Sequence, residues 1–118
     1  MALSYVKIQT VDNASPGKLI DVQITIHNIS ATTIVAMPVL RVNGSWADEG
    51  TEKVIVSKTE TTWTLNFIMP NVDAFVRVED WCENAEPWHL DDVEEKIIDV
   101  LTQESEFDNL VVTISKGE

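Results

Sequence analysis

The sequence predicts an all-β fold, an antiparallel sandwich of about seven to eight strands. Three observations support this fold class. Apolar and polar residues alternate along several stretches, as they do in strands with one buried face. β-branched residues are abundant, and turn residues interrupt the pattern at intervals of about 8–12 residues. The length of 118 residues gives room for a single domain, predicted over residues 1–118.

The clearest strands lie at LIDVQITIHN (19–28) and TTWTLNFIM (61–69), where every second residue is large and apolar. The second pattern places Trp63 in the core, unlike the other three tryptophans. A third strand, DAFVRVEDW (73–81), is expected to point Phe75, Arg77 and Glu79 outward. The residues expected on the buried faces of these strands are Ile20, Val22, Ile24, Ile26, Leu65, Phe67, Ala74, Val76 and Val78.

Turn residues separate these runs. Pro16-Gly17 and Asn43-Gly44 are typical of tight turns, the second within a hairpin. Pro38 lies inside the apolar run IVAMPVLRV, where it removes a backbone donor, so this position is expected at an edge or a bulge.

Residues 90–101 fit two patterns. As a helix, this segment would align Leu90, Val93, Ile97 and Leu101 on one face. We favour a strand from about Val93 to Leu101, because a sandwich needs a partner for strand 73–81. NLVVTISK (109–116) alternates again, with Leu110, Val112 and Ile114 on one face, and is expected to add a last strand.

These strand and turn patterns resemble a known family. SPGKLIDVQITIHNIS, TTWTLNFIMPNVDAFVRVEDW, and WHLDD followed by KIIDV are similar to immunoglobulin-like modules of bacteria and archaea. The nearest family is the cell-adhesion-related (CARDB-type) domain of bacteria, over roughly residues 15–100. The resemblance implies an immunoglobulin-like sandwich and, more weakly, an adhesion role. The predicted strand near residue 110 departs from the family pattern.

The charge of the chain disfavours several partners. Twenty acidic against eight basic residues give a net charge of −12, which repels nucleic acid and anionic membranes. No apolar run is long enough to span a bilayer, and the first residues lack the pattern of a signal peptide. A single cysteine forms no internal disulfide. From Glu79 to Asp108 there are twelve acids and one base.

The most crowded stretch is RVEDWCENAEPWHLDDVEE (77–95), with eight carboxylates. Residues 82–89 are expected to connect two strands. Weak calcium candidates in and beside this connection are Asp80, Glu83, Asp91 and Asp92, with Asp48, Glu49 and Glu52 on a neighbouring loop. Zinc is disfavoured, because Cys82 and His89 lie seven residues apart and lack the usual paired spacing. No metal or other cofactor is therefore expected, and a solvated acidic end is the favoured interpretation.

Trp46, Trp81 and Trp88 lie at loops or strand ends, where their rings could stack on sugars. The alternative, which we favour, is that they cap the ends of the sandwich. Enzymatic activity is not expected, because no nucleophile motif or phosphate loop is present. His27 is expected on the outer face of its strand and His89 in a loop.

The sequence thus favours a non-enzymatic structural or interaction module. Our first hypothesis is a virion-associated protein, a capsid decoration or tail component, whose partners are proteins, a virion shell or its own copies. The alternative is a cell-surface adhesion or glycan-binding module, and a calcium-binding surface domain comes third. The location expected from these hypotheses is a virion or a cell surface.

Overall fold

The computed structural model describes residues 2–84 and 87–102, and these residues form nine strands without a helix. No long apolar helix that could cross a membrane is found among them. The strands are β1 (Ser4–Gln9), β2 (Asn13–Ala14), β3 (Leu19–Asn28), β4 (Ile34–Val42), β5 (Ser45–Glu49), β6 (Lys53–Ile55), β7 (Glu60–Ile68), β8 (Ala74–Glu83) and β9 (His89–Val100).

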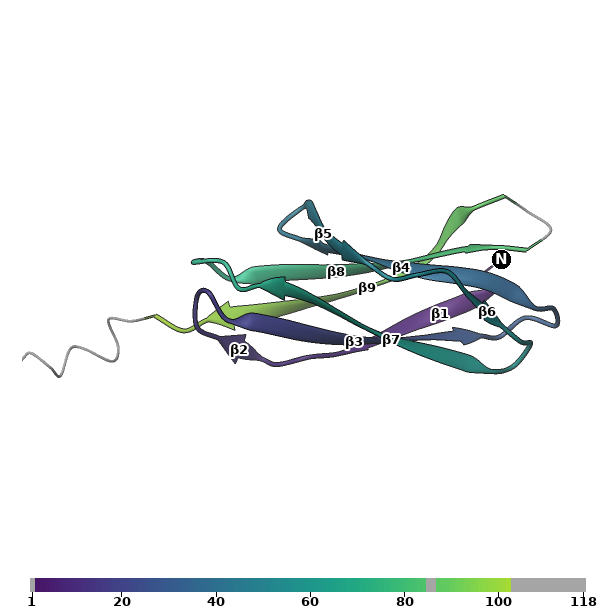
Figure 1. Cartoon of the computed structure of the whole chain (residues 1–118), viewed down its shortest axis with the longest axis horizontal. Coiled ribbons are helices and arrows are strands. Elements are labelled where there is room, and N and C mark those ends of the chain that lie inside the picture. The colour runs from purple at the N-terminus through teal and green to yellow at the C-terminus, as the bar shows by residue number, and fades with distance from the viewer. Residues whose placement is uncertain (1, 85–86, 103–118) are drawn as a thin grey trace, which may run out of the picture.

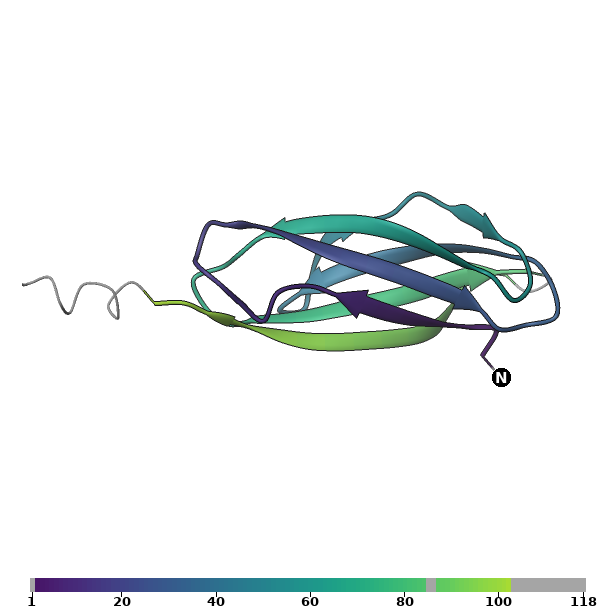
Figure 2. The ribbon, with the colours of Figure 1, turned by 90° about the horizontal axis from the view of Figure 1, so that it is seen from below.

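The strands form two sheets that face each other (Figures 1 and 2). The small sheet has the order β1-β3-β7, and the large sheet has the order β2-β9-β8-β4-β5, with β6 also paired to β4. The pairs are antiparallel except for the two-residue β2, which runs parallel to the end of β9. The predicted all-β sandwich is confirmed, with nine strands in the described residues in place of the expected seven to eight, two of them very short (β2 and β6).

The core follows the alternation of the sequence. All nine residues assigned above to buried faces are buried, and Trp63 joins them at 5% exposure. Gly50 makes room for this tryptophan, because a Cβ atom there would lie 2.5 Å from Trp63 Cδ1 and 2.9 Å from Pro38 Cδ. The indole nitrogen of Trp63 donates to the carbonyl of Thr51 at 2.8 Å.

The predicted turns form for identifiable reasons. Asn43 and Gly44 have φ of 52° and 85°, and Val42 pairs with Ser45, which gives a two-residue hairpin loop of type I′. Pro38 lies where the outer partner of β4 changes from β6 to β5. The carbonyl of Pro38 accepts a hydrogen bond from Gly50 N and therefore points away from β8. The nitrogen of a strand residue points to the same side as its carbonyl, so the missing N–H of Pro38 removes no hydrogen bond to β8.

Asn28 ends β3 and organises the loop after it. Its side chain is fully buried, and its Nδ2 donates to the carbonyls of Thr32 (2.8 Å) and Ile55 (2.9 Å). Its Oδ1 accepts from the backbone N and the Oγ of Ser30. The side chain of Asn28, the last residue of β3, therefore provides hydrogen bonds to a loop that is not part of a β-sheet.

The ambiguous segment 90–101 is a strand, as favoured, and β9 starts earlier than expected, at His89. Its register with β8 is irregular. Asp80 pairs with Asp92, and the next residue, Trp81, pairs with Leu90. Asp91 on β9 is therefore an extra residue with no partner of its own in the β8–β9 pairing. Such a bulge changes the direction of a side chain. The predicted strand near residue 110 lies outside the described residues.

Candidate functional site

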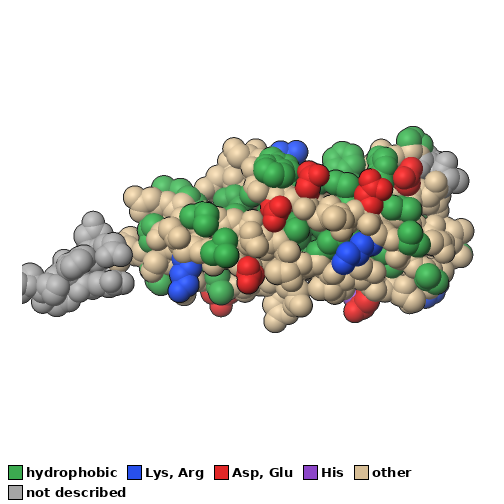
Figure 3. Space-filling view, in the orientation of Figure 1, with side chains coloured by type: hydrophobic (Ala, Val, Ile, Leu, Met, Phe, Trp, Pro, Cys, Tyr) green, Lys and Arg blue, Asp and Glu red, His purple; other side chains and the backbone are tan. Residues whose placement is uncertain are grey.

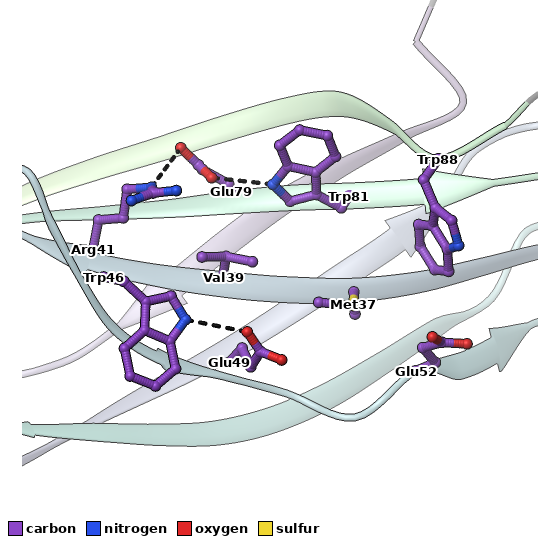
Figure 4. A pocket seen from close by; sticks show the side chains of 9 residues that line it. All are labelled: Met37, Val39, Arg41, Trp46, Glu49, Glu52, Glu79, Trp81 and Trp88. Atoms are coloured by element: carbon purple, nitrogen blue, oxygen red, sulfur yellow. Dashed lines mark hydrogen bonds and ion pairs between the residues drawn. The ribbon is translucent and has the colours of Figure 1, made fainter.

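A groove of about 350 Å³ lies on the outer face of the large sheet, over β4, β5 and β8. Figure 4 shows Met37 and Val39 on β4 between two rows of larger side chains. In the space-filling view, apolar and acidic side chains alternate along the upper rim, over β5 and the start of β9 (Figure 3). The residues lining the groove are Met37, Val39, Arg41, Trp46, Glu49, Glu52, Glu79, Trp81 and Trp88.

The groove brings together the three tryptophans singled out in the sequence as sugar-stacking candidates. They come from different elements: Trp46 from β5, Trp81 from β8 and Trp88 from the residue before β9. Trp46 is 56% exposed, so it does not cap the core as we had favoured. Trp81 and Trp88 are half-buried.

Two of the indoles are held in place by carboxylates. Trp46 Nε1 donates to Glu49 Oε1 at 3.1 Å, and Trp81 Nε1 donates to Glu79 Oε1 at 3.0 Å (Figure 4). Because these bonds lie in the plane of each ring, they fix its orientation and leave its flat faces available. A fixed aromatic face loses little conformational freedom when a ligand stacks on it.

Glu79 points to the outer face, as predicted, but it is only 6% exposed. Its Oε2 accepts from Arg41 Nε at 3.2 Å and from Arg77 Nε at 3.0 Å. Burial raises the pKa of Glu79, but the bonds from Trp81 and Arg77 and the positive charges of Arg41 and Arg77 outweigh it. The pKa therefore lies below its usual value of 4.5, and the carboxylate stays ionised at neutral pH.

Three of the calcium candidates, Asp80, Asp91 and Asp92, converge on the opposite, inner face of the large sheet, where they bind β1. Asp91 Oδ2 accepts from the backbone N of Leu3 (2.9 Å) and the backbone N of Ser4 (2.7 Å). It also lies 2.7 Å from Ser4 Oγ, whose single hydrogen is shared with Asp80. Asp92 Oδ2 accepts from the backbone N of Val6 at 2.9 Å. These carboxylates therefore take the place of a strand partner for the outer edge of β1.

Asp80 completes this inner group, which we call the acidic cluster: Ser4, Asp80, Asp91 and Asp92. Asp80 is fully buried, and its Oδ2 accepts from Ser4 Oγ at 2.6 Å. Burial, together with the negative charges of Asp91 and Asp92, raises its pKa to about 7. The fourth candidate, Glu83, follows the inward-pointing Cys82, so strand alternation places it on the other face.

Cys82 and His89 were expected in a connection, but both lie within strands and pair with each other across β8 and β9. The Sγ of Cys82 lies 3.8 Å from His89 Nε2, which lies 3.3 Å from Asp91 Oδ1. Burial and the carboxylates of Asp91 and Asp80 raise the pKa of Cys82 to about 12, which opposes nucleophilic chemistry.

The arrangement also differs from a catalytic triad. In a triad the thiol and the carboxylate contact different nitrogens of the histidine. Here both contact Nε2, and Nδ1 lies 3.0 Å from the carbonyl of Pro87. The second histidine, His27, stacks on Tyr5 with 4.4 Å between ring centroids and lies 3.0 Å from Glu60.

The fold is an immunoglobulin-like β-sandwich with an aromatic groove on the outer face of its large sheet. No protein-family model and no curated protein matches the sequence.

The structure matches CARDB domains, as the resemblance in the sequence implied. One is a crystal structure of a CARDB domain from Pyrococcus furiosus in complex with di-metal ions. It has 16% sequence identity and a TM-score of 0.65, and the match covers 83% of this chain and 87% of that chain. A solution structure of the CARDB domain from the same organism has 15% identity and a TM-score of 0.66, over 84% and 94% of the two chains.

A glycosyl hydrolase family 2 member from Bacteroides cellulosilyticus matches with 12% identity and a TM-score of 0.51. The match covers 81% of this chain but only 15% of the hydrolase chain. At these identities the likeness establishes the fold, which is that of a CARDB domain.

Proposed function

We propose that this protein is a non-catalytic, adhesion-type module that binds a neutral carbohydrate chain in the tryptophan groove. The observation that carries the proposal is the convergence of Trp46, Trp81 and Trp88 on one groove. Indole rings offer broad apolar faces that fit the C–H faces of sugars. The similarity to CARDB domains supports an adhesion-type role, and we apply it to this chain only as part of this proposal.

The polar groups of the groove favour a neutral ligand. Glu49, Glu52 and Glu79 supply acceptors for sugar hydroxyls, whereas Arg41 is already engaged with Glu79. A sulfated or uronic-acid polymer would meet these carboxylates and a net charge of −12, which repel anions. The groove also lies open on a sheet face, where an extended polymer can pass across it.

The virion role stays a prediction. The strand expected near residue 110, which could have paired with a neighbouring subunit by edge addition, lies outside the described residues. The groove gives the adhesion and glycan alternative a defined surface, and we therefore prefer it here.

A glycan array followed by titration of tryptophan fluorescence tests the proposal. We expect binding of neutral polysaccharides, and little binding of their sulfated or uronic-acid counterparts. Replacement of the exposed ring, Trp46→Ala, should weaken binding at least about tenfold, because one stacking contact is worth about 1.5 kcal/mol. Isothermal titration calorimetry measures this loss without relying on the tryptophan signal that the variant alters.

Phe75→Ala is the matched control. Phe75 is an exposed aromatic residue on the outer face of the same sheet, on β8, but it does not line the groove. This variant should keep the affinity of the parent protein. If no neutral glycan binds, or if both variants weaken binding equally, the groove is not the carbohydrate site.

A further inference from the structure

Three side chains of different chemistry converge on the inner face of the large sheet, away from the groove. Cys82 Sγ lies 3.8 Å from His89 Nε2, which in turn lies 3.3 Å from Asp91 Oδ1. All three ligand atoms lie within 4.8 Å of one another. Donors around one tetrahedral zinc ion are separated by about 3.3–3.6 Å, given bonds of about 2.0–2.3 Å, so small side-chain movements would complete the geometry.

The hydrogen bond of His89 determines which nitrogen faces the cluster. Nδ1 lies 3.0 Å from the carbonyl of Pro87, and a carbonyl accepts only, so Nδ1 carries a proton. In the neutral ring, Nε2 then presents its lone pair to Cys82 Sγ and Asp91 Oδ1. A lone pair that faces a carboxylate is repelled unless a proton or a metal cation lies between them, and a backbone carbonyl on the other nitrogen is the usual second partner of a metal-binding histidine.

Asp80 provides an independent sign that a cation belongs here. It precedes Cys82 by two residues on β8, so both side chains point to the inner face, and both are fully buried. Its Oδ2 accepts from Ser4 Oγ, whose other neighbours include Asp91 Oδ2 at 2.7 Å and Cys82 Sγ at 4.0 Å. Its Oδ1 has no hydrogen-bond partner among the described residues, an uncommon condition for a buried carboxylate oxygen.

We propose that Cys82, His89 and Asp91 bind a divalent transition-metal ion of the zinc class, with the buried carboxylate of Asp80 linked to these ligands through Ser4 Oγ. Thiolate and imidazole ligands favour such ions over calcium, which takes oxygen ligands alone. On binding, Cys82 releases its proton to solvent and forms the metal–sulfur bond as a thiolate. Thiolate and carboxylate then balance the two charges of the ion.

The ion can approach from the side of His89, because the side chain of His89 is 36% exposed to solvent. The side chain of Asp91 is 4% exposed, and Cys82 is fully buried. Because Asp91 also binds Leu3 and Ser4, the metal would link β8 and β9 to the edge strand of the other sheet. The site shares no residue with the tryptophan groove, so the two proposals fail or succeed separately.

Cobalt substitution tests the proposal directly. Protein stripped with a chelator is titrated with Co²⁺, and we expect one equivalent to bind and to give a thiolate-to-cobalt charge-transfer band. Cys82→Ser should abolish that band, and His89→Gln should weaken metal binding at least about tenfold. Zn²⁺ should displace the cobalt and should raise the melting temperature of the parent protein but not of Cys82→Ser.

His27→Gln is the matched control, because it removes the other histidine of the chain, which faces Tyr5 and Glu60. It should bind cobalt like the parent protein. Circular dichroism of each variant without metal shows whether it folds, and an unfolded Cys82→Ser is replaced by Cys82→Ala. Absence of the charge-transfer band from the folded parent protein, or an unchanged band in a folded Cys82 variant, would overturn the proposal.

Discussion

The two faces of β8 differ in how they satisfy their charges. On the outer face, Glu79 is bound by Arg41, Arg77 and the indole of Trp81. On the inner face, Asp80 has a single hydrogen-bond donor among the described residues, Ser4, and one of its oxygens has no partner among them. Neighbouring residues of one strand thus lie in two surroundings of different chemistry, because strand side chains alternate between faces. On the outer face, the carboxylate of Glu79 is neutralised and hydrogen-bonded by neighbouring side chains. On the inner face, the carboxylates have, for their number, fewer hydrogen-bond donors and positive charges around them among the described residues.

The two faces also differ in what holds them. Most of the groove consists of side chains on paired strands, and its exposed tryptophan, Trp46, can change without disturbing the backbone. The acidic cluster instead binds the backbone of β1 to β9, and within residues 2–84 and 87–102 no strand ladder joins the two sheets. We therefore expect substitutions of the cluster residues and of the buried Glu79 to affect stability, and substitution of the exposed Trp46 to affect binding.

The largest effect is expected from Asp91→Ala. The change removes the acceptor of the backbone hydrogen bonds from Leu3 and Ser4 and leaves both N–H donors near the core. Each such donor costs roughly 1–3 kcal/mol when unpaired, and part of this is recovered from water, so we expect a loss of about 3 kcal/mol. Urea unfolding measures the change.

Asp92→Ala is the control for this prediction, because Asp92 accepts one such bond, from Val6. It should cost about 1 kcal/mol. Equal losses in the two variants would show that the number of bonds to β1 does not determine the contribution of each carboxylate.

A smaller effect, of about 1 kcal/mol, is expected from Glu79→Gln at neutral pH, because both arginine partners are partly exposed and solvent screens their charges. This effect depends on pH. Because the pKa of Glu79 in the folded state lies below its usual 4.5, the ionised carboxylate stabilises the fold above that pH. The stabilisation is lost as the pH falls through the folded-state pKa.

The difference in stability between the parent protein and Glu79→Gln should therefore shrink when unfolding is measured at progressively lower pH from 7 to 3. A difference that stays constant over this range would mean that the paired charge of Glu79 does not stabilise the fold. The variant also tests whether the orientation of Trp81 depends on this carboxylate, which near-ultraviolet circular dichroism reports.

The smallest effect on stability is expected from Trp46→Ala. Trp46 is 56% exposed and bonds only the exposed Glu49 among the described residues, so its removal should change the free energy of unfolding by less than about 0.5 kcal/mol. The same variant should lose carbohydrate binding. A large loss of stability would instead favour the capping role that the sequence suggested for this residue.

Much of the fold could be predicted from local patterns. The alternation in residues 19–28 and 61–69 identified the buried faces, including Trp63, because burial in a sandwich follows strand periodicity. Asn43-Gly44 predicted its hairpin, since these residues readily adopt positive φ. The candidate site could be predicted only in part from the sequence. The sequence identified its three tryptophans as separate candidates, but it did not predict that they line one groove.

What the sequence by itself determined is the set of strands, their buried faces and the residues available for chemistry. Only the tertiary structure decided which of these residues meet. The spacing of Cys82 and His89 argued against zinc, yet antiparallel pairing sets them opposite each other. The bulge at Asp91 turns its carboxylate inward, and the approach of β1 from the other sheet supplies donors distant in sequence. Register, bulges and sheet packing depend on contacts between segments that are distant in sequence, so they cannot be predicted from local periodicity.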